Sequence, residues 1–381
     1  MSYILSIVIP TKNRYFTLFN LIDSILSFNL CSTQIVIHDN SDDNTDALRF
    51  LKSINTSNIC YKHSNEKLDV IQNFDKTICL SSGKYICLLG DDDAVMPYIE
   101  SVAWWMHNNE IQSLKSNMPV YFWPGLKLSK ISNEQTGVLR LKKIIYEIRK
   151  KSCINGVHET LRKGGTDMSA LPFLYHGIVS KIELDKIFNK CGTFFPGPSP
   201  DMASSIAIAL ETKYFHYLGF PLIISGKCIN STGGEGVLGN HVNRIEDVKH
   251  LPKNTSQEWN SNIPKYWTGP TIWAQSVVRS LENMGHSDKV KLLNFDYLIA
   301  KLFVYNYSYL KHVFENFSFS ITCRYLFHVL SLFSLRLRLV IFRKFAYQKK
   351  STEVVDIKSA IDIIMKTVDV KRIKSLLDAI K

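Results

Sequence analysis

The sequence predicts a doubly wound α/β domain, with a mostly parallel sheet between two layers of helices, followed by a helical C-terminal region. Two observations lead to this fold class. Through the first hundred residues, short β-branched runs alternate with segments whose apolar residues recur at helical spacing. The last of these runs, residues 85–89, is apolar at every position, as expected of a strand buried on both faces of a parallel sheet.

The expected elements follow a β-α-β-α-β-α-β order, which implies right-handed crossovers. Strands are predicted at 3–9, 34–38, 59–62 and 85–89. Helices are predicted at 17–28, around 47–54, and over 70–78, the last with Gly83 as its C-cap residue. From about 110 to 240 the pattern is less regular, and beyond 265 we expect helices without strands.

Composition and charge narrow the classes of function. The 381 residues include 46 Lys and Arg against 34 Asp and Glu, a formal charge of +12 that suits an anionic partner. The eight cysteines form no CxxC pair, which predicts reduced thiols and a cytoplasmic location. The first ten residues have no basic region before their apolar run, so we expect a strand and not a signal peptide. No apolar stretch reaches the ~18 residues that span a bilayer.

Polar residues follow three of the predicted strands, at 11–14, 39–43 and 91–93. Ligands bind at the carboxyl ends of the strands in such sheets, so these segments predict one shared site. In an extended backbone Asp91 and Asp93 would point to one side and Asp92 to the other. Paired carboxylates suit Mg²⁺ or Mn²⁺ bridging a diphosphate. The alternative is a solvated acidic turn, or an N-cap for a helix starting near Pro97.

Asp39 also has two interpretations. It could cap the loop into the next helix, which is a common role for Asp. It could instead accept hydrogen bonds from the base or the sugar of a nucleotide.

Three segments together resemble one known family. Residues 6–14 (SIVIPTKNR) resemble the opening strand and turn of family 2 glycosyltransferases. Residues 35–45 (IVIHDNSDDNT) resemble their second strand and acidic loop, and residues 83–93 (GKYICLLGDDD) resemble the approach to their DxD motif. The order and spacing of all three match over about residues 1–110. His38 is a departure, because the family often has Asp at this position.

The resemblance implies a GT-A type fold and inverting transfer from a nucleoside-diphosphate sugar, with a UDP-sugar as the expected donor. It implies that Asp93 and Asp91 hold Mn²⁺ or Mg²⁺. The residues implied to contact the nucleotide sugar are Pro10, Thr11, Arg14, Asp39, Asp91 and Asp92.

Inverting transfer needs a general base that removes the proton of the acceptor hydroxyl. The family usually supplies it from an acidic pair at the start of a helix, and Asp201 falls there, with Pro200 in place of the first acid. The alternative for Asp201 is an N-cap of the helix expected over 202–210. Glu235, in the polar loop 233–236 near Lys227 and His241, is the reserve candidate. That loop could close over the donor, or it could be an ordinary surface loop.

The segment 320–347 combines apolar residues at three- and four-residue steps with arginines, a pattern typical of helices that lie on anionic membranes. The alternative is a helix packed on the catalytic domain, and residues 357–380 predict packed helices or a partner surface. We expect a nucleotide-sugar-binding half at 1–110, an acceptor-binding half at 111–240 and a helical region at 265–381. The acceptor expected by analogy is a lipid-linked glycan in bacterial O-antigen or capsule synthesis, at the inner face of the cell membrane.

Three rival functions fit less well. A nucleotidyltransferase should carry a glycine-rich loop at 11–14, and an aspartyl phosphatase should carry its nucleophile where Pro10 stands. A nucleic-acid-binding protein is suggested by the charge alone, but the basic residues are spread widely and form no recognition motif. No nucleic-acid partner is therefore expected.

Overall fold

The computed structural model describes residues 3–379 except 55, 127–136, 232, 235, 237–241, 316, 318–320 and 343–348. The strands are β1 (Leu5–Thr11), β2 (Thr33–Asp39), β3 (Ile59–His63), β4 (Tyr85–Leu88), β5 (Ala94–Val95), β6 (Ser113–Asn117), β7 (Val120–Phe122), β8 (Gly137–Leu141), β9 (Ile148–Ser152), β10 (Gly177–Ser180), β11 (Tyr214–Pro221), β12 (Ile223–Lys227) and β13 (Lys349–Val354). The α-helices are α1 (Tyr15–Leu26), α2 (Thr45–Ser53), α3 (Val70–Cys79), α4 (Ile99–Asn108), α5 (Cys153–Arg162), α6 (Lys181–Cys191), α7 (Pro200–Glu211), α9 (Gly269–Asn283), α10 (Phe295–Tyr305), α11 (Leu310–Val313), α12 (Cys323–Phe342), α13 (Ile357–Met365) and α14 (Val370–Ala379). Short 3₁₀ helices are η1 (Ile245–Asp247), η2 (Ser287–Leu292) and η3 (Tyr307–Tyr309).

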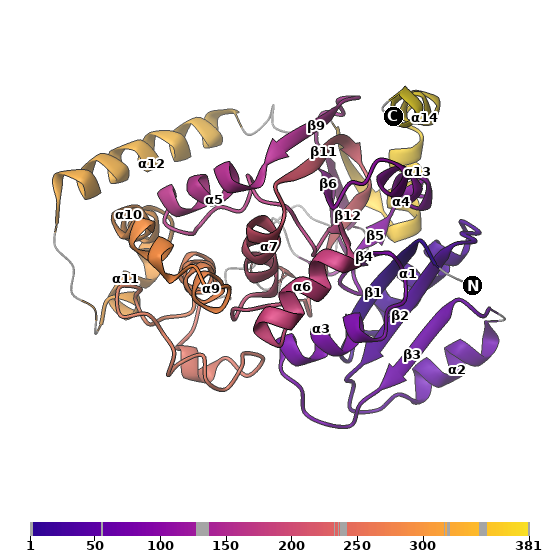
Figure 1. Cartoon of the computed structure of the whole chain (residues 1–381), viewed down its shortest axis with the longest axis horizontal. Helices are drawn as coiled ribbons and strands as arrows, with labels where there is room; N and C mark the ends of the chain where they lie inside the picture. The colour runs from indigo at the N-terminus through magenta and orange to yellow at the C-terminus, as the bar shows by residue number, and fades with distance from the viewer. Residues whose placement is uncertain are drawn as a thin grey trace.

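The main sheet has eight strands in the order β3-β2-β1-β4-β10-β6-β11-β9. The first four are mutually parallel, β10 runs antiparallel to both its neighbours, and β9 runs antiparallel to β11. Alternate residues of β1 enter different cores, because successive side chains point to opposite faces. Ile7 packs with α1 and α4, and Val8 packs with α3 and α6. The predicted doubly wound, mostly parallel sheet is therefore confirmed (Figure 1).

The predicted strands and helices of the first hundred residues are all present, with ends shifted by about two residues or fewer at most boundaries. One local prediction was wrong. Gly83 does not cap α3, which already ends at Cys79 with Leu80 as its C-cap. A Cβ atom at Gly83 would lie 2.5 Å from the backbone nitrogen of Ser6, so glycine is needed there for close packing of two backbones.

The C-terminal region is helical, as predicted, but it also contains a strand that the sequence did not predict. β13 pairs antiparallel with β8 and completes a second sheet in the order β13-β8-β7-β12-β5. Ile357, Ile361 and Ile364 of α13 are buried in the core that also contains α1. The end of the chain thus returns to the N-terminal half, where α13 and α14 lie beside α4 (Figure 1).

A third group of helices covers the far end of the main sheet. α7 packs against α5, α6 and α9, and all residues from Met202 to Ala209 are buried. Its small side chains, such as Ala203, Ser204 and Ala207, allow neighbouring helices to approach on every side. α12 packs on α10.

All eight cysteines are free thiols, in agreement with the sequence prediction. Within the described residues, the structure has no helix with the length and apolar character that crossing a bilayer requires.

Candidate active site

The carboxyl ends of β1 and β4 bring Thr11, Arg14 and Asp91 into direct contact. The Thr11 hydroxyl donates a hydrogen bond to Asp91 Oδ2 over 2.6 Å, and Arg14 Nε donates to the same oxygen over 3.1 Å. Arg14 Nε also lies 3.0 Å from Asp91 Oδ1, but at an angle unsuited to a hydrogen bond, so this buried oxygen has no hydrogen-bond partner. The sequence correctly predicted that these strand ends form one polar cluster.

The Asp91 carboxyl is fully buried, and this controls its protonation. Burial raises its pKa to about 7, although the charge of Arg14 opposes the increase. Because burial disfavours the charged form, a cation at this carboxyl would favour its deprotonated state. The oxygen Oδ1 is the only one of the two that is free to accept such a contact without breaking a hydrogen bond.

Of the three carboxylates in the turn, Asp93 accepts the most hydrogen bonds. Its Oδ2 accepts hydrogen bonds from the Gly90 N–H and from His176 Nε2, each at 2.7 Å, and its Oδ1 accepts one from the Gly226 N–H at 2.7 Å. Burial alone would raise the pKa of Asp93, but the contacts with His176 and Gly226 hold it below its ordinary value. Asp93 thus fixes three separate segments to one another.

The backbone through Asp91–Asp93 is a turn and not an extended strand, so the predicted alternation of side chains does not apply. The turn is closed by a hydrogen bond from the Asp93 N–H to the Gly90 carbonyl. Gly226 of β12 passes directly beneath it, where a Cβ atom would lie 1.6 Å from the Asp92 carbonyl oxygen. The three carboxylates therefore point to three different partners, and Asp92 Oδ2 accepts its hydrogen bond from the Cys228 N–H over 3.1 Å.

This turn offers carboxylate oxygens for a hard cation. A carboxylate can accept about four hydrogen bonds, one at each lone pair of its two oxygens. Asp93 accepts three hydrogen bonds from the protein, Asp91 accepts two and Asp92 accepts one. The space that a Cβ atom of Gly90 would fill lies 3.0 Å from Asp92 Oδ1 and 3.1 Å from Asp93 Oδ2. No group of three or more His, Cys, Asp or Glu side chains that could hold a metal ion occurs among the described residues. Carboxylates at the turn and the oxygens of a diphosphate would together supply ligands of the type Mg²⁺ or Mn²⁺ prefers.

Asp39 lies at the end of β2, fully buried beside this cluster. Its Oδ2 accepts hydrogen bonds from the hydroxyls of Tyr15 and Tyr61, both over 2.7 Å, and its Oδ1 accepts one from the Ser41 N–H. Burial, and then the bond to Asp39, raises the pKa of both tyrosines. Asp39 does not cap the next helix, because the N-cap of α2 is Asn44. Its predicted contact with a nucleotide base remains a prediction.

Three residues that hold this site together, Tyr15, Tyr61 and His176, are not among those predicted from the sequence. Tyr15 is the first residue of α1 and Tyr61 lies in the middle of β3, the strand that pairs with β2, so the predicted order of elements was a usable signal for both. His176 had no such signal, since it approaches Asp93 from 83 residues further along the chain with a backbone φ of 67°. His38 has a packing role: its two ring nitrogens contact Asn73 Oδ1 at 2.6 Å and Ser64 Oγ at 2.9 Å.

Asp201 lies in the first turn of α7, as predicted, but it is not the cap residue. The N-cap is Ser199, whose hydroxyl donates to Asp201 Oδ1 over 2.5 Å, and the Met202 N–H donates to the same oxygen over 2.8 Å. Asp201 Oδ2 has no hydrogen-bond partner within the described part of the chain and is available to accept a proton. The reserve candidate Glu235 lies outside the described residues, as does His241.

Part of the chain is similar in sequence to one known family. Residues 6–163 match the family described as Glycosyl transferase family 2. None of the curated proteins matches the chain. S. aureus TarS 1–349 in complex with UDP-GlcNAc is 12% identical with a TM-score of 0.47, and the match covers 91% of this chain and 93% of that one. A mannosyltransferase from Pyrobaculum calidifontis in complex with GDP-Man and Mn²⁺ is 10% identical with a TM-score of 0.42, covering 96% and 87%.

The similarity to glycosyltransferase family 2 thus covers residues 6–163, a segment that includes β1–β4 and the acidic turn at Asp91–Asp93.

Proposed function

We propose that the chain is an inverting, metal-dependent glycosyltransferase that moves a sugar from a nucleoside-diphosphate sugar to a hydroxyl group of a glycan. The observation that carries this proposal is the acidic turn at Asp91–Asp93 beside Arg14, at the carboxyl ends of two parallel strands. A UDP-sugar is the expected donor. Pro10, Thr11 and Asp39 would line the nucleotide side of the site, with Arg14 supplying positive charge toward the diphosphate.

The carboxylates of the turn would hold Mn²⁺ or Mg²⁺. Asp91 and Asp93 are the predicted ligands, and we add Asp92 because its Oδ1 has no hydrogen-bond partner among the described residues. When bound, the cation would neutralise charge on the departing diphosphate. Asp93 would also position the turn through its bonds to His176 and Gly226.

Asp201 would act as the general base. Its carboxylate would take the proton of the acceptor hydroxyl while that oxygen forms a bond to the anomeric carbon of the donor sugar. The bond from the anomeric carbon to the diphosphate oxygen breaks with its electron pair on the diphosphate, so the configuration at that carbon inverts. The Ser199 hydroxyl and the Met202 N–H would keep Oδ1 in place and leave Oδ2 for the proton.

The proposal is tested by turnover of a nucleotide sugar without acceptor, since water can replace the acceptor hydroxyl. We expect wild-type protein with Mn²⁺ to release nucleoside diphosphate from at least one nucleotide sugar. Removal of the metal with EDTA should lower this rate at least a hundredfold, because several kcal/mol of charge stabilisation would be lost. A rate that is unchanged by EDTA would contradict the metal role.

We further propose that the acceptor is a lipid-linked glycan in bacterial O-antigen or capsule synthesis, and that α12 holds the enzyme on the cytoplasmic membrane surface. Tyr325 and Leu332 of α12 are buried on α10. The outward face is apolar and exposed, with Phe327 66%, Leu330 72% and Phe333 62% exposed. The exposed side chains of Arg324 and Arg338 lie at its margin, which suits anionic lipid headgroups.

Replacing Leu330 by Asp should weaken binding to vesicles of anionic phospholipid at least tenfold. Burying a leucine side chain contributes about 1.5–3 kcal/mol, and the new carboxylate adds repulsion. The matched control is Ile182→Asp on α6, a side chain that is 67% exposed. Vesicle sedimentation measures both variants. Equal binding by wild type and Leu330→Asp, or no binding by wild type, would overturn the membrane role of α12.

A further inference from the structure

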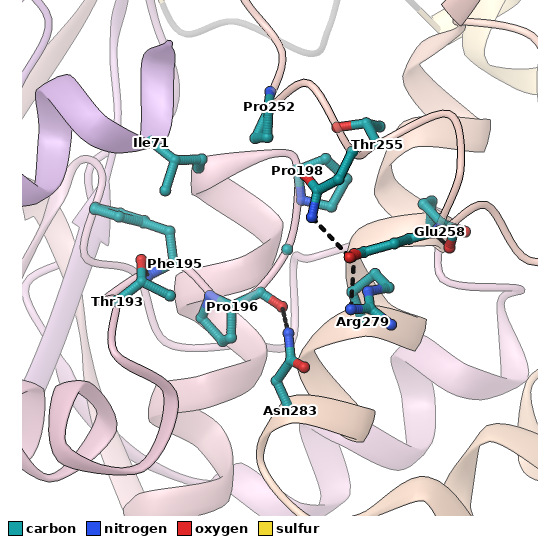
Figure 2. Close-up of a pocket in the computed structure, with 13 residues that line it drawn as sticks. Ile71, Thr193, Phe195, Pro196, Pro198, Pro252, Thr255, Glu258, Arg279 and Asn283 are labelled. Carbon is teal, nitrogen blue, oxygen red and sulfur yellow. Dashed lines mark hydrogen bonds and ion pairs between the residues drawn. The ribbon is translucent and has the colours of Figure 1, made fainter. Parts of the chain in front are cut away.

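A cavity of about 160 Å³ lies beside the segment that leads into α7 (Figure 2). Three parts of the chain enclose it: residues 193–198, residues 252–258 and the helix α9. Ile71, at the start of α3, closes the side toward the main sheet. These residues come from the second half of the chain and from α3, and none of them belongs to the acidic turn.

One side of the cavity carries carboxylate, amide and guanidinium groups that are bonded to one another. Glu258 Oε2 lies 2.7 Å from Arg279 Nη2, and the Asn254 side-chain amide donates to Glu258 Oε1 over 2.7 Å (Figure 2). Arg279 is also paired with Glu282 at 2.9 Å. The guanidinium is thus compensated by carboxylates, so this wall presents hydrogen-bonding groups without net positive charge. Among the described residues that line the cavity, Arg279 is the one cationic side chain, and it is paired with carboxylates.

The opposite side of the cavity is apolar. Phe195, Pro196, Pro198, Pro252 and Ile71 supply its carbon atoms. A neutral sugar has the complementary character, because its ring carries C–H groups on its faces and hydroxyl groups at its edge. Carboxylate, amide and guanidinium groups can hydrogen-bond to such hydroxyls, while the C–H groups contact the apolar wall.

The lining of the cavity lies close in the chain to Asp201, the proposed base. Pro198 is three residues before Asp201, so their Cα atoms are at most about 11 Å apart. Toward the acidic turn, the ring of Phe195 lies 5.6 Å from that of Phe74, which lies 6.2 Å from the ring of Tyr175. The Tyr175 hydroxyl lies 2.7 Å from the position of a Cβ atom at Gly90. A sugar in the cavity would therefore contact the segment that leads directly to Asp201.

Hydrogen bonds hold both ends of the segment 193–199, which lines the cavity and leads to Asp201. Asp75 accepts hydrogen bonds from the Thr193 hydroxyl over 2.7 Å and from the Phe194 N–H over 2.9 Å. At the other end, the Ser199 N–H donates to Ser276 Oγ over 2.9 Å. A ligand in the cavity and the Asp201 carboxylate would consequently keep a fixed relation to each other.

We propose that this cavity is an acceptor subsite, which binds one neutral sugar unit of the glycan next to the unit that receives the new sugar. This inference rests on the proposed transferase function. Glu258 and Asn254 are the residues that recognise the hydroxyl groups, and Arg279 positions the Glu258 carboxylate.

The test uses the whole chain and a panel of methyl glycosides of neutral hexoses and N-acetylhexosamines as probes. Saturation-transfer NMR detects which glycosides contact the protein, and titration gives their Kd. We expect at least one glycoside to bind, with a Kd at least tenfold weaker in Glu258→Ala and in Asn254→Ala, because each variant removes a hydrogen-bonding group. The matched control is Asp46→Ala, which breaks the exposed ion pair with Arg49 at 2.9 Å on α2 and should leave binding unchanged.

Two outcomes would overturn the subsite: no glycoside contacts the wild-type protein, or both cavity variants bind as well as wild type. Thermal unfolding of each variant establishes that it is folded, and Asn254→Ala changes an exposed side chain that leaves the Glu258–Arg279 pair in place. Donor hydrolysis separates this inference from the proposed function. If the subsite alone is wrong, wild type and the control Asp46→Ala still hydrolyse donor, whereas failure of the proposed function would leave wild type itself inactive.

Discussion

Replacing Asp201 by Asn is expected to lower the rate of donor turnover by about 10²–10⁴-fold and to leave the Kd for the nucleotide sugar within a factor of about three. The rate change is the usual contribution of a general base, because an amide cannot accept the proton of the attacking hydroxyl. The affinity should persist because the hydrogen bonds of Asp201 are to Ser199 and Met202, and none is to the turn at Asp91–Asp93. Asn retains an oxygen that can accept from the Ser199 hydroxyl and the Met202 N–H.

Initial rates of nucleoside diphosphate release and calorimetric titration with the donor measure the two quantities separately. Ser199→Ala is the control, since it removes a hydrogen bond to Oδ1 and keeps the carboxylate; we expect a loss of tenfold or less. If Asp201→Asn retains the wild-type rate, Asp201 is not the base. The polar loop that contains Glu235 would then be the next place to look.

The second large effect concerns stability. Asp93→Ala should lower the free energy of unfolding by about 3–5 kcal/mol, in the range found when one partner of a buried charged network is removed. The variant leaves the N–H groups of Gly90 and Gly226, and the His176 ring, without their shared acceptor. Asp92→Ala removes a side chain that accepts one hydrogen bond, from the Cys228 N–H, and should cost about 1–3 kcal/mol.

Urea unfolding followed by circular dichroism compares the two variants with wild type. The expected order of midpoints is wild type, then Asp92→Ala, then Asp93→Ala at the lowest urea concentration. A midpoint for Asp93→Ala equal to that of wild type would show that the network of His176 and Gly226 does not hold the turn. Lost activity in Asp93→Ala alone could reflect a displaced turn, so Asp92→Asn is the better variant for testing the cation.

The first half of the fold was predictable because its signals are local. Apolar periodicity and β-branched runs locate β1 to β4 and the helices between them, and the parallel order follows from the connections. The other half of the main sheet depends on short strands such as β10, four residues long and antiparallel to both neighbours. β13 joins the second sheet from about 210 residues beyond β8, and no local pattern encodes that pairing.

In the candidate site, too, contacts between neighbouring strand ends were predictable and contacts between distant segments were not. Thr11, Arg14 and Asp91 meet as expected because the ends of adjacent parallel strands share one edge. The orientation of Asp91 and Asp93 was not predictable from strand geometry, because the chain leaves β4 at Leu88 and enters a turn. His176 was not predictable at all, since its contact with Asp93 depends on where β10 begins.

Release of nucleoside diphosphate from a panel of UDP-, GDP-, ADP- and TDP-sugars tests the central claim most directly. It is measured with Mn²⁺ and with EDTA, for wild type, for Asp92→Asn and for the exposed control Asp46→Asn on α2. We expect at least one donor, and a UDP-sugar first, to be hydrolysed by wild type and by the control. Chelation should lower the rate at least a hundredfold, and Asp92→Asn should lower it at least tenfold. If no donor is hydrolysed with Mn²⁺, and calorimetry detects no binding of any nucleotide sugar, the proposed transferase function is wrong for this chain.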